Sequence, residues 1–95
     1  MPAEEKIYWV YVLLSLRDQH HYYGLSADVS SRVKQHNAGK VRSTKARRPF
    51  VLIYSEKVGS LAAARERERY LKSAAGRHFL MKMLTESKGS GSPPA

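Results

Sequence analysis

The chain has 95 residues, enough for one domain with a single modest core. It contains no cysteine, which excludes a disulfide scaffold, a thiol nucleophile and a zinc site with thiolate ligands. Lys and Arg number 17 against 8 Asp and Glu, and the resulting net charge of +9 favours polyanionic partners, nucleic acid first among them. No apolar run reaches the length of a membrane span, and no secretory signal is present, so we expect a cytoplasmic protein that does not bind membranes.

Three segments of the sequence predict β-strands. Residues 7–14 are rich in β-branched and aromatic side chains, which is typical of a strand covered on both faces. After a short polar turn, residues 20–25 return as the second arm of a hairpin, and residues 50–56 form a third strand that is again apolar on both faces. Strand alternation places Tyr11 on the opposite face from its immediate neighbours. Gly24 interrupts the second strand, which indicates a bend or a close backbone approach.

Helices are predicted between and after these strands. The first helix begins at a cap formed by Ser26 or Asp28 and ends near Gly39, which suits a left-handed terminal residue. The second helix runs from residue 61 to about 75, and Ser60 precedes it as a cap.

A break at Gly76 is expected to separate the second helix from a short third helix over residues 77–84, with Phe79, Leu80, Met83 and Leu84 on its inner side. The predicted fold is therefore α+β: a small three-stranded sheet sandwiched by helices, in the order β-β-α-β-α-α. We expect the domain to span residues 6–84, with an N-terminal tail at 1–5 and a disordered tail at 85–95.

The first predicted helix carries two polar residues on its inward face. Val29, Arg32, Val33 and His36 follow the i, i+3, i+4, i+7 spacing of a single helix face. A buried guanidinium is costly unless an anion meets it, so Arg32 and His36 are candidate site residues. The alternative is an Asp28–Arg32 pair one turn apart, with His36 as an ordinary boundary histidine.

The second predicted helix places one acid inward. Glu68 falls within the apolar stripe of this helix, whereas Glu66 points to the opposite side. An inward carboxylate either pairs with a cation, for which Lys72 is one turn away, or holds a metal. A single carboxylate with water and phosphate oxygens is a normal way to hold Mg²⁺.

The loop after the first helix supplies a candidate phosphate-binding surface. Five cations lie within nine residues: Lys40, Arg42, Lys45, Arg47 and Arg48. Ser43 and Thr44 add neutral donors, and the composition suits contacts to a nucleic-acid backbone rather than base reading. The alternative is a solvated loop.

Carboxylate, guanidinium, imidazole and phenol groups together suit phosphodiester hydrolysis. Their order along the chain resembles the GIY-YIG nuclease superfamily, in particular its short stand-alone members, over about residues 6–84. The matching elements are Trp9-Val10-Tyr11, Tyr22-Tyr23-Gly24, Arg32, His36-Asn37, the loop from Gly39 to Lys45, Arg48-Pro49, Leu52-Ile53-Tyr54, Arg67-Glu68-Arg69-Tyr70-Leu71-Lys72, Gly76-Arg77 and Phe79. The first motif departs from glycine-isoleucine-tyrosine, Tyr23 stands where isoleucine is usual, and no asparagine follows Lys72.

The resemblance implies a metal-dependent endonuclease with one Mg²⁺ or Mn²⁺ ion. It implies that Glu68 binds the metal and that Arg32 stabilises the scissile phosphate. Tyr11 and Tyr22 would orient or deprotonate the attacking water, and His36 would hydrogen-bond a tyrosine hydroxyl or help remove its proton.

The implied substrate is DNA, with RNA as the second choice, cleaved at a structure of the kind met in repair or recombination. A protein partner could supply further specificity. The alternative function is a nucleic-acid-binding module without catalysis, or a nuclease subunit that needs a partner.

Overall fold

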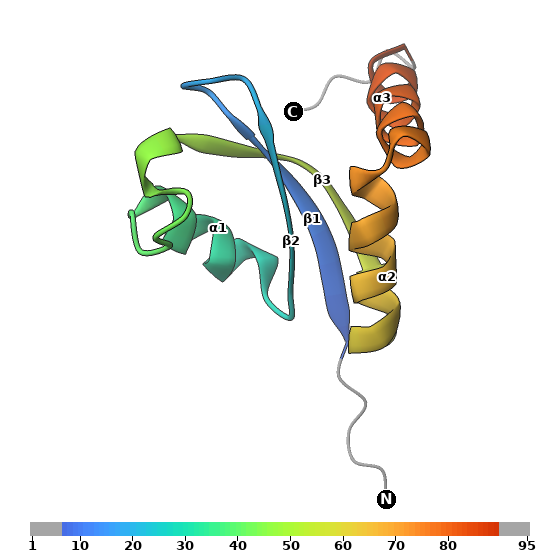
Figure 1. Ribbon diagram of the computed structural model, residues 1–95, viewed down its shortest axis with the longest axis horizontal. Coiled ribbons are helices and arrows are strands. Elements are labelled where there is room, and N and C mark those ends of the chain that lie inside the picture. The colour runs from blue at the N-terminus through green and yellow to red at the C-terminus, as the bar shows by residue number, and fades with distance from the viewer. Residues whose placement is uncertain (1–6, 90–95) are drawn as a thin grey trace, which may run out of the picture.

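The computed structural model describes residues 7–89 and contains one antiparallel sheet with helices on both faces (Figure 1). The elements are β1 (Tyr8–Ser15), β2 (His21–Ser26), α1 (Val29–Asn37), the 3₁₀ turn η1 (Lys45–Arg47), β3 (Phe50–Val58), α2 (Leu61–Lys72) and α3 (Ala74–Gly89). The sheet order is β2-β1-β3, so β1 is central and β2 is an edge strand. The α+β class and the predicted element order are confirmed.

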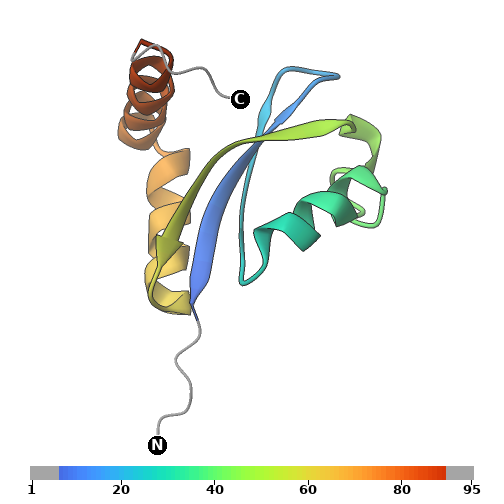
Figure 2. The ribbon, with the colours of Figure 1, turned by 180° about the vertical axis from the view of Figure 1, so that it is seen from behind.

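The two faces of the sheet are covered by different segments of the chain. The helix α1 and the loop after it lie on one face, whereas α2 and α3 lie on the other (Figures 1 and 2). One core cluster contains Val10, Val12, Ala64, Leu71 and Leu80, and the other contains Tyr11, Leu13 and Phe50. The alternation predicted for β1 therefore holds, and it directs Tyr11 toward α1.

The predicted helix ends agree with the structure for α1 and for the start of α2. Asp28, one of the two candidate caps, accepts a hydrogen bond from the Ser31 amide at 3.1 Å. Gly39 has φ +79°, the left-handed backbone expected after α1. Ser60 caps α2 through the amide of Ala63 at 3.1 Å.

The boundary between α2 and α3 differs from the prediction. The helix α2 ends at Lys72, and Ser73 rather than Gly76 breaks the chain, because the Ser73 hydroxyl donates to the carbonyl of Tyr70. Gly76 lies inside α3, where a Cβ atom would overlap the carbonyl oxygen of Tyr70. The glycine at this position thus permits close packing of two helices.

The length of α3 also corrects the prediction. It runs from Ala74 to Gly89, whereas the predicted helix covered residues 77–84. Residues 1–5 and 90–95 of the expected tails lie outside the described residues. Leu80 is buried as predicted, but Met83 is 39% exposed.

In β3, Val51 and Leu52 are also exposed, because this strand is the second edge of the sheet and is not covered along its whole length.

Candidate active site

Tyr11 and Gly24 face each other across the pairing of β1 with β2. A Cβ atom on residue 24 would lie 2.6 Å from both Cζ and Oη of Tyr11, closer than side-chain atoms approach one another. The end of the Tyr11 ring therefore lies over Gly24 of the edge strand β2, in a buried position. This contact explains the glycine that interrupts the second strand: it permits a close approach, here by a phenol.

The Tyr11 hydroxyl is tied to a buried histidine. Its oxygen lies 3.1 Å from Nε2 of His36, and Nδ1 of His36 lies 2.8 Å from Oγ1 of Thr44. All three residues are at most 1% exposed. The Tyr22 ring packs 4.8 Å from the imidazole between ring centroids, and the Phe50 ring 5.9 Å from it. Packing and hydrogen bonds thus hold the imidazole in one orientation.

The hydrogen bonds of Thr44 favour one tautomer of His36. The Thr44 hydroxyl can donate to the carbonyl of Val41 at 3.4 Å and then accept from Nδ1–H of His36. Nε2 is left with a lone pair that accepts the proton of the Tyr11 hydroxyl. This arrangement gives each of the three protons an acceptor inside the protein, and it leaves His36 as a base toward Tyr11.

Burial and neighbouring charges keep both partners of this bond neutral. Burial raises the pKa of Tyr11, and the adjacent Arg32 guanidinium opposes that increase, while Tyr22 and Glu68 add to it. Burial, followed by the charge of Arg32, lowers the pKa of His36 below its usual value. At neutral pH the pair is therefore a phenol and an uncharged imidazole.

Arg32 reaches the same place from α1. Its Nη1 donates to Oε1 of Gln35 at 2.8 Å, whereas Asp28 caps the helix, so the alternative Asp28–Arg32 pair does not form. Arg32 and Gln35 line a cleft of about 420 Å³ together with Ser26, Asp28 and Ser31, and Tyr11 is not part of this lining. The guanidinium is half-buried, affects the pKa of the Tyr11 hydroxyl, and shares the cleft with the Asp28 carboxylate.

Glu68 approaches from the other face of the sheet. Its side chain is 23% exposed, whereas Glu66 is exposed, as the sequence predicted for the two acids. The predicted alternative partner is present, since Nζ of Lys72 lies 3.1 Å from the carboxylate. Glu68 also contributes to the raised pKa of Tyr11, as a smaller effect than those of burial, Arg32 and Tyr22.

One acid could take part in holding a hard cation. Within residues 7–89 no three His, Cys, Asp or Glu side chains gather into a metal-binding cluster. Glu68 could supply one carboxylate ligand, with water and phosphate oxygens completing the shell, as Mg²⁺ accepts. The Lys72 ammonium balances this carboxylate and would have to release it.

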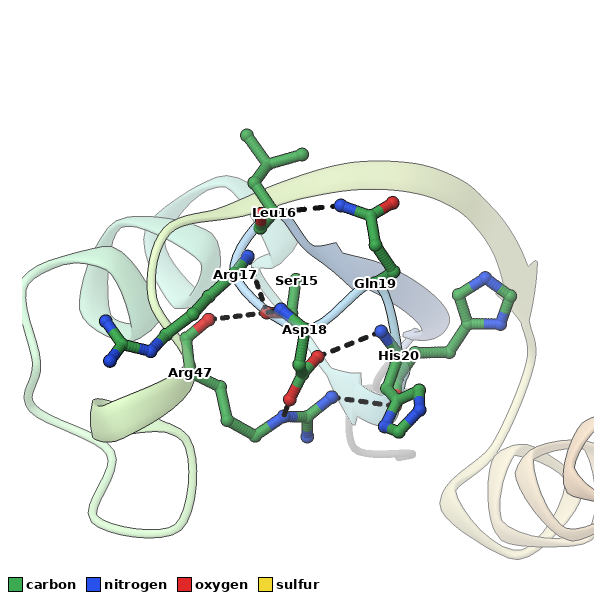
Figure 3. Close-up of polar contacts among 8 residues, drawn as sticks. Ser15, Leu16, Arg17, Asp18, Gln19, His20 and Arg47 are labelled. Atoms are coloured by element: carbon green, nitrogen blue, oxygen red, sulfur yellow. Dashed lines mark hydrogen bonds and ion pairs between the residues drawn. The ribbon is translucent and has the colours of Figure 1, made fainter.

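The five cations of the basic loop divide into two groups. Lys40, Arg42 and Lys45 are exposed. Arg47, in contrast, donates from Nε to Asp18 at 2.9 Å and lies over the Phe50 ring at 5.5 Å, so it ties the loop to the hairpin (Figure 3). Arg48 donates from Nε to the Lys45 carbonyl at 2.8 Å.

The structure corrects the role predicted for the Thr44 hydroxyl. Thr44 was expected to offer a hydroxyl to phosphate, but it is buried and bonded to His36. No periodicity links these two residues, because one belongs to a loop and the other to a helix. The only available signal was the presence of a hydroxyl residue in a loop predicted to lie close to α1.

Comparison with known proteins identifies the family of the chain. The profile of the GIY-YIG catalytic domain matches residues 7–83. The chain therefore belongs to the GIY-YIG family, a nuclease family whose substrates are nucleic acids and whose members generally use divalent metal ions. None of the helices within residues 7–89 is long and apolar enough to cross a membrane.

Within this family the chain is similar to small UPF0213 proteins. It is 38% identical over 80 residues to UPF0213 protein SH2523 of Staphylococcus haemolyticus, covering 83% of this chain and 95% of the relative. It is 39% identical over 67 residues to UPF0213 protein NP_0776A of Natronomonas pharaonis, covering 70% and 78%. The solution structure of UPF0213 protein BH0048 from Bacillus halodurans aligns with a TM-score of 0.49 and 30% identity, over 81% of this chain and 84% of that one.

Proposed function

We propose that this chain is a metal-dependent endonuclease that hydrolyses phosphodiester bonds in DNA, preferentially at nicked or branched structures. One observation carries the proposal: the Tyr11 hydroxyl lies over Gly24 at the sheet edge and is hydrogen-bonded to a buried His36 that Thr44 orients. A phenol coupled to an imidazole of fixed tautomer is suited to moving a proton.

The proposed chemistry begins with water next to Tyr11. As the water oxygen attacks phosphorus, its proton passes to Oη of Tyr11 and the phenolic proton passes to Nε2 of His36. The P–O bond to one sugar oxygen breaks at the same time, the departing oxygen takes a proton from solvent, and His36 later returns its proton to solvent through Tyr11. The imidazolium that results keeps its Nδ1–H bond to Thr44. Because the raised pKa of Tyr11 disfavours a free phenolate, the phenol would pass its proton to His36 as it receives one from water.

Two further groups would act on the phosphate. Arg32, which borders the cleft beside α1, would donate to the non-bridging oxygens as negative charge builds on them. A divalent ion held by Glu68 would supply positive charge that polarises the phosphate. Tyr22, packed against His36, would orient the water as the second phenol.

The exposed cations of the basic loop support a backbone-contacting mode of binding. Lys40, Arg42 and Lys45 offer charge without a base-reading element, so affinity would depend on the path of the backbone rather than on sequence. A structural feature such as a nick or a branch changes that path. DNA is the proposed substrate, with RNA as the competitor to test beside it.

The direct test is cleavage by the full chain. Nicked, branched and single-stranded DNA and matched RNA are incubated with Mg²⁺, with Mn²⁺ or with chelator. We expect cleavage of the nicked or branched DNA only when metal is present. Glu68→Gln should abolish cleavage and leave binding nearly intact, whereas Glu66→Gln, in the exposed acid of the same helix, should change neither. Full activity in Glu68→Gln would show that the metal assignment is wrong.

One observation favours the second candidate, a module that binds nucleic acid without cleaving it alone. The Glu68 carboxylate is already paired with Lys72 at 3.1 Å. A chain that binds DNA but cleaves none of the substrates with either metal would fit this candidate, including a subunit that a partner activates.

A further inference from the structure

The turn between β1 and β2 is fixed to the basic loop by one buried hydroxyl. Ser15 is 0% exposed, and its Oγ donates to the Arg47 carbonyl at 2.7 Å (Figure 3). The same oxygen accepts from the amides of Arg17 and Asp18, each at 3.1 Å. A single side chain thus sets the positions of two segments that lie 32 residues apart.

Two more contacts strengthen this connection. The carboxylate of Asp18 pairs with Nε of Arg47 at 2.9 Å, and the guanidinium of Arg47 holds the pKa of Asp18 at about 2. The Leu16 amide donates to the Pro49 carbonyl at 2.8 Å. Because Asp18 is occupied by Arg47, the one acid in this turn does not neutralise Arg17.

A cleft of about 350 Å³ lies where the turn and the loop meet. Its lining residues are Arg17, Asn37, Lys45, Ala46, Arg48 and Pro49. Three of these carry positive charge and none carries negative charge. Over residues 7–89, Arg17, Lys45 and Arg48 form no ion pair.

The walls of the cleft are held in place before any ligand arrives. The Asn37 amide group is fully engaged by the backbone of Phe50, at 3.0 Å to its carbonyl and 2.7 Å from its amide. The Arg48 guanidinium lies against Gly39, where a Cβ atom would come within 2.8 Å of Nη1, and its Nε bonds the Lys45 carbonyl. The terminal nitrogens of Arg48 remain available as donors.

We propose that this cleft binds a phosphate group of the nucleic-acid backbone at a second point, outside the place of cleavage, through Arg17, Lys45 and Arg48. Three like charges gathered at one cleft repel one another, and an anion between them relieves that repulsion. A planar guanidinium suits a phosphate because it can donate two parallel hydrogen bonds. That this phosphate belongs to a polynucleotide, and is not free phosphate, rests on the proposed function.

The position of the cleft connects it to the candidate active site. Lys45 follows Thr44 directly, and Thr44 turns inward to His36 while Lys45 faces the cleft. A strand anchored here would have a fixed orientation relative to Tyr11. Arg17 is the residue that sequence analysis did not single out, since it lies in the hairpin turn and not in the basic loop.

The test measures how DNA binding by the full chain depends on salt. A labelled duplex carrying one nick is titrated at several salt concentrations with the native protein, Arg17→Gln, Arg17→Lys and, as a charge-matched control on α3, Lys82→Gln. Loss of one phosphate contact should lower the slope of log K against log salt by about 0.9. We expect that decrease in Arg17→Gln, a slope close to native in Arg17→Lys, and no change in Lys82→Gln. Equal slopes for Arg17→Gln and Lys82→Gln would overturn the proposal.

A second measurement separates this proposal from the proposed function. Inorganic phosphate is titrated into isotope-labelled protein, and the amide signals of Arg17, Lys45 and Arg48 are followed. Perturbation of these signals without any DNA binding would overturn the polynucleotide assignment and leave a site for free phosphate. The expected slope changes in a protein that never cleaves DNA would support the cleft and reject the nuclease activity.

Discussion

Oγ1 of Thr44 lies 2.8 Å from Nδ1 of His36, although the two residues belong to different segments and are eight positions apart. Both are buried, and His36 continues the chain of hydrogen bonds to Tyr11. The loop that follows α1 therefore determines which imidazole nitrogen faces the phenol. Thr44 is a positioning residue in this scheme, because it acts on the reaction through His36.

Replacing Thr44 with valine tests this role. Thr44→Val keeps the shape but leaves Nδ1–H of His36 buried without an acceptor, which should destabilise the fold by about 1–3 kcal/mol. The cleavage rate should fall by up to about 100-fold, because His36 is no longer held in the tautomer that accepts a proton. Denaturant unfolding and single-turnover cleavage measure the two effects. Thr85→Val, at an exposed threonine of α3, is the matched control, and equal rates for the two variants would contradict the role.

Gly24→Ala tests the close approach of the phenol. The added methyl would lie 2.6 Å from Cζ and Oη of Tyr11, so the ring must move and lose its bond to His36. We expect a loss of about 1–3 kcal/mol in stability, as for other overpacked sites, and a fall in cleavage rate without loss of DNA affinity. Gly59→Ala is the matched control, since nothing lies within 4 Å of a Cβ atom there. A Gly24→Ala protein with native cleavage would show that the position of the Tyr11 hydroxyl is unimportant.

The lowered pKa of His36 predicts how activity and stability vary with pH. Burial and Arg32 depress this pKa below 6.5, so the acid limb of the rate profile should have its midpoint below that value. In the unfolded chain the imidazole binds a proton near pH 6.5, before it does so in the folded state. The stabilising effect of His36 is therefore complete above pH 6.5 and is lost as the pH falls toward the folded pKa.

Titration of His36 by NMR measures the shift directly, and denaturant unfolding between pH 7.5 and 5.5 measures its effect on stability. The pKa of His21 is lowered as well, so a His21→Gln background isolates the contribution of His36. A folded His36 that titrates at or above 6.5 would refute the assignment of a neutral base.

The variant Lys72→Met distinguishes Glu68 as a metal ligand from Glu68 as only the ion-pair partner of Lys72. The Lys72 side chain is 54% exposed, so loss of the ion pair should change stability by at most about 0.5 kcal/mol. If Glu68 is the metal ligand, removal of the competing ammonium should raise the affinity for Mn²⁺ several-fold. Calorimetry or electron paramagnetic resonance measures that affinity, with Lys82→Met as the control. An unchanged Mn²⁺ affinity would show that Glu68 is only the ion-pair partner of Lys72 and does not bind the metal.

Local patterns were sufficient to predict the elements of the fold. Alternation in β1 separates Tyr11 from Val10 and Val12, and the structure places them in two different core clusters. Asp28 and Gly39 mark the ends of α1, because a capping carboxylate and a left-handed glycine act within a few residues. Such signals depend only on neighbouring positions, so they can be read along the chain.

Features that depend on long-range contacts could not be predicted in the same way. The sequence offered no sign that Ser15 would bond Arg47, or that Arg47 would serve the fold through Asp18. The end of α2 at Ser73 could not be predicted either, since it arises from a hydrogen bond of the Ser73 hydroxyl to the preceding helical turn. Gly76, which suggested the helix end, instead permits close packing of α3 against Tyr70. The basic loop was correctly seen as a charged segment, but its division into tethered and exposed cations required the path of the backbone.

The place of β2 at the border of the sheet separates two ways in which copies of this chain could pair their strands. Under the proposed function, a second copy that added a strand alongside Gly24 would stand in the path of a nucleic acid approaching Tyr11, and we expect such a dimer not to cleave. Association through β3, on the far side of the central strand, would leave that path clear.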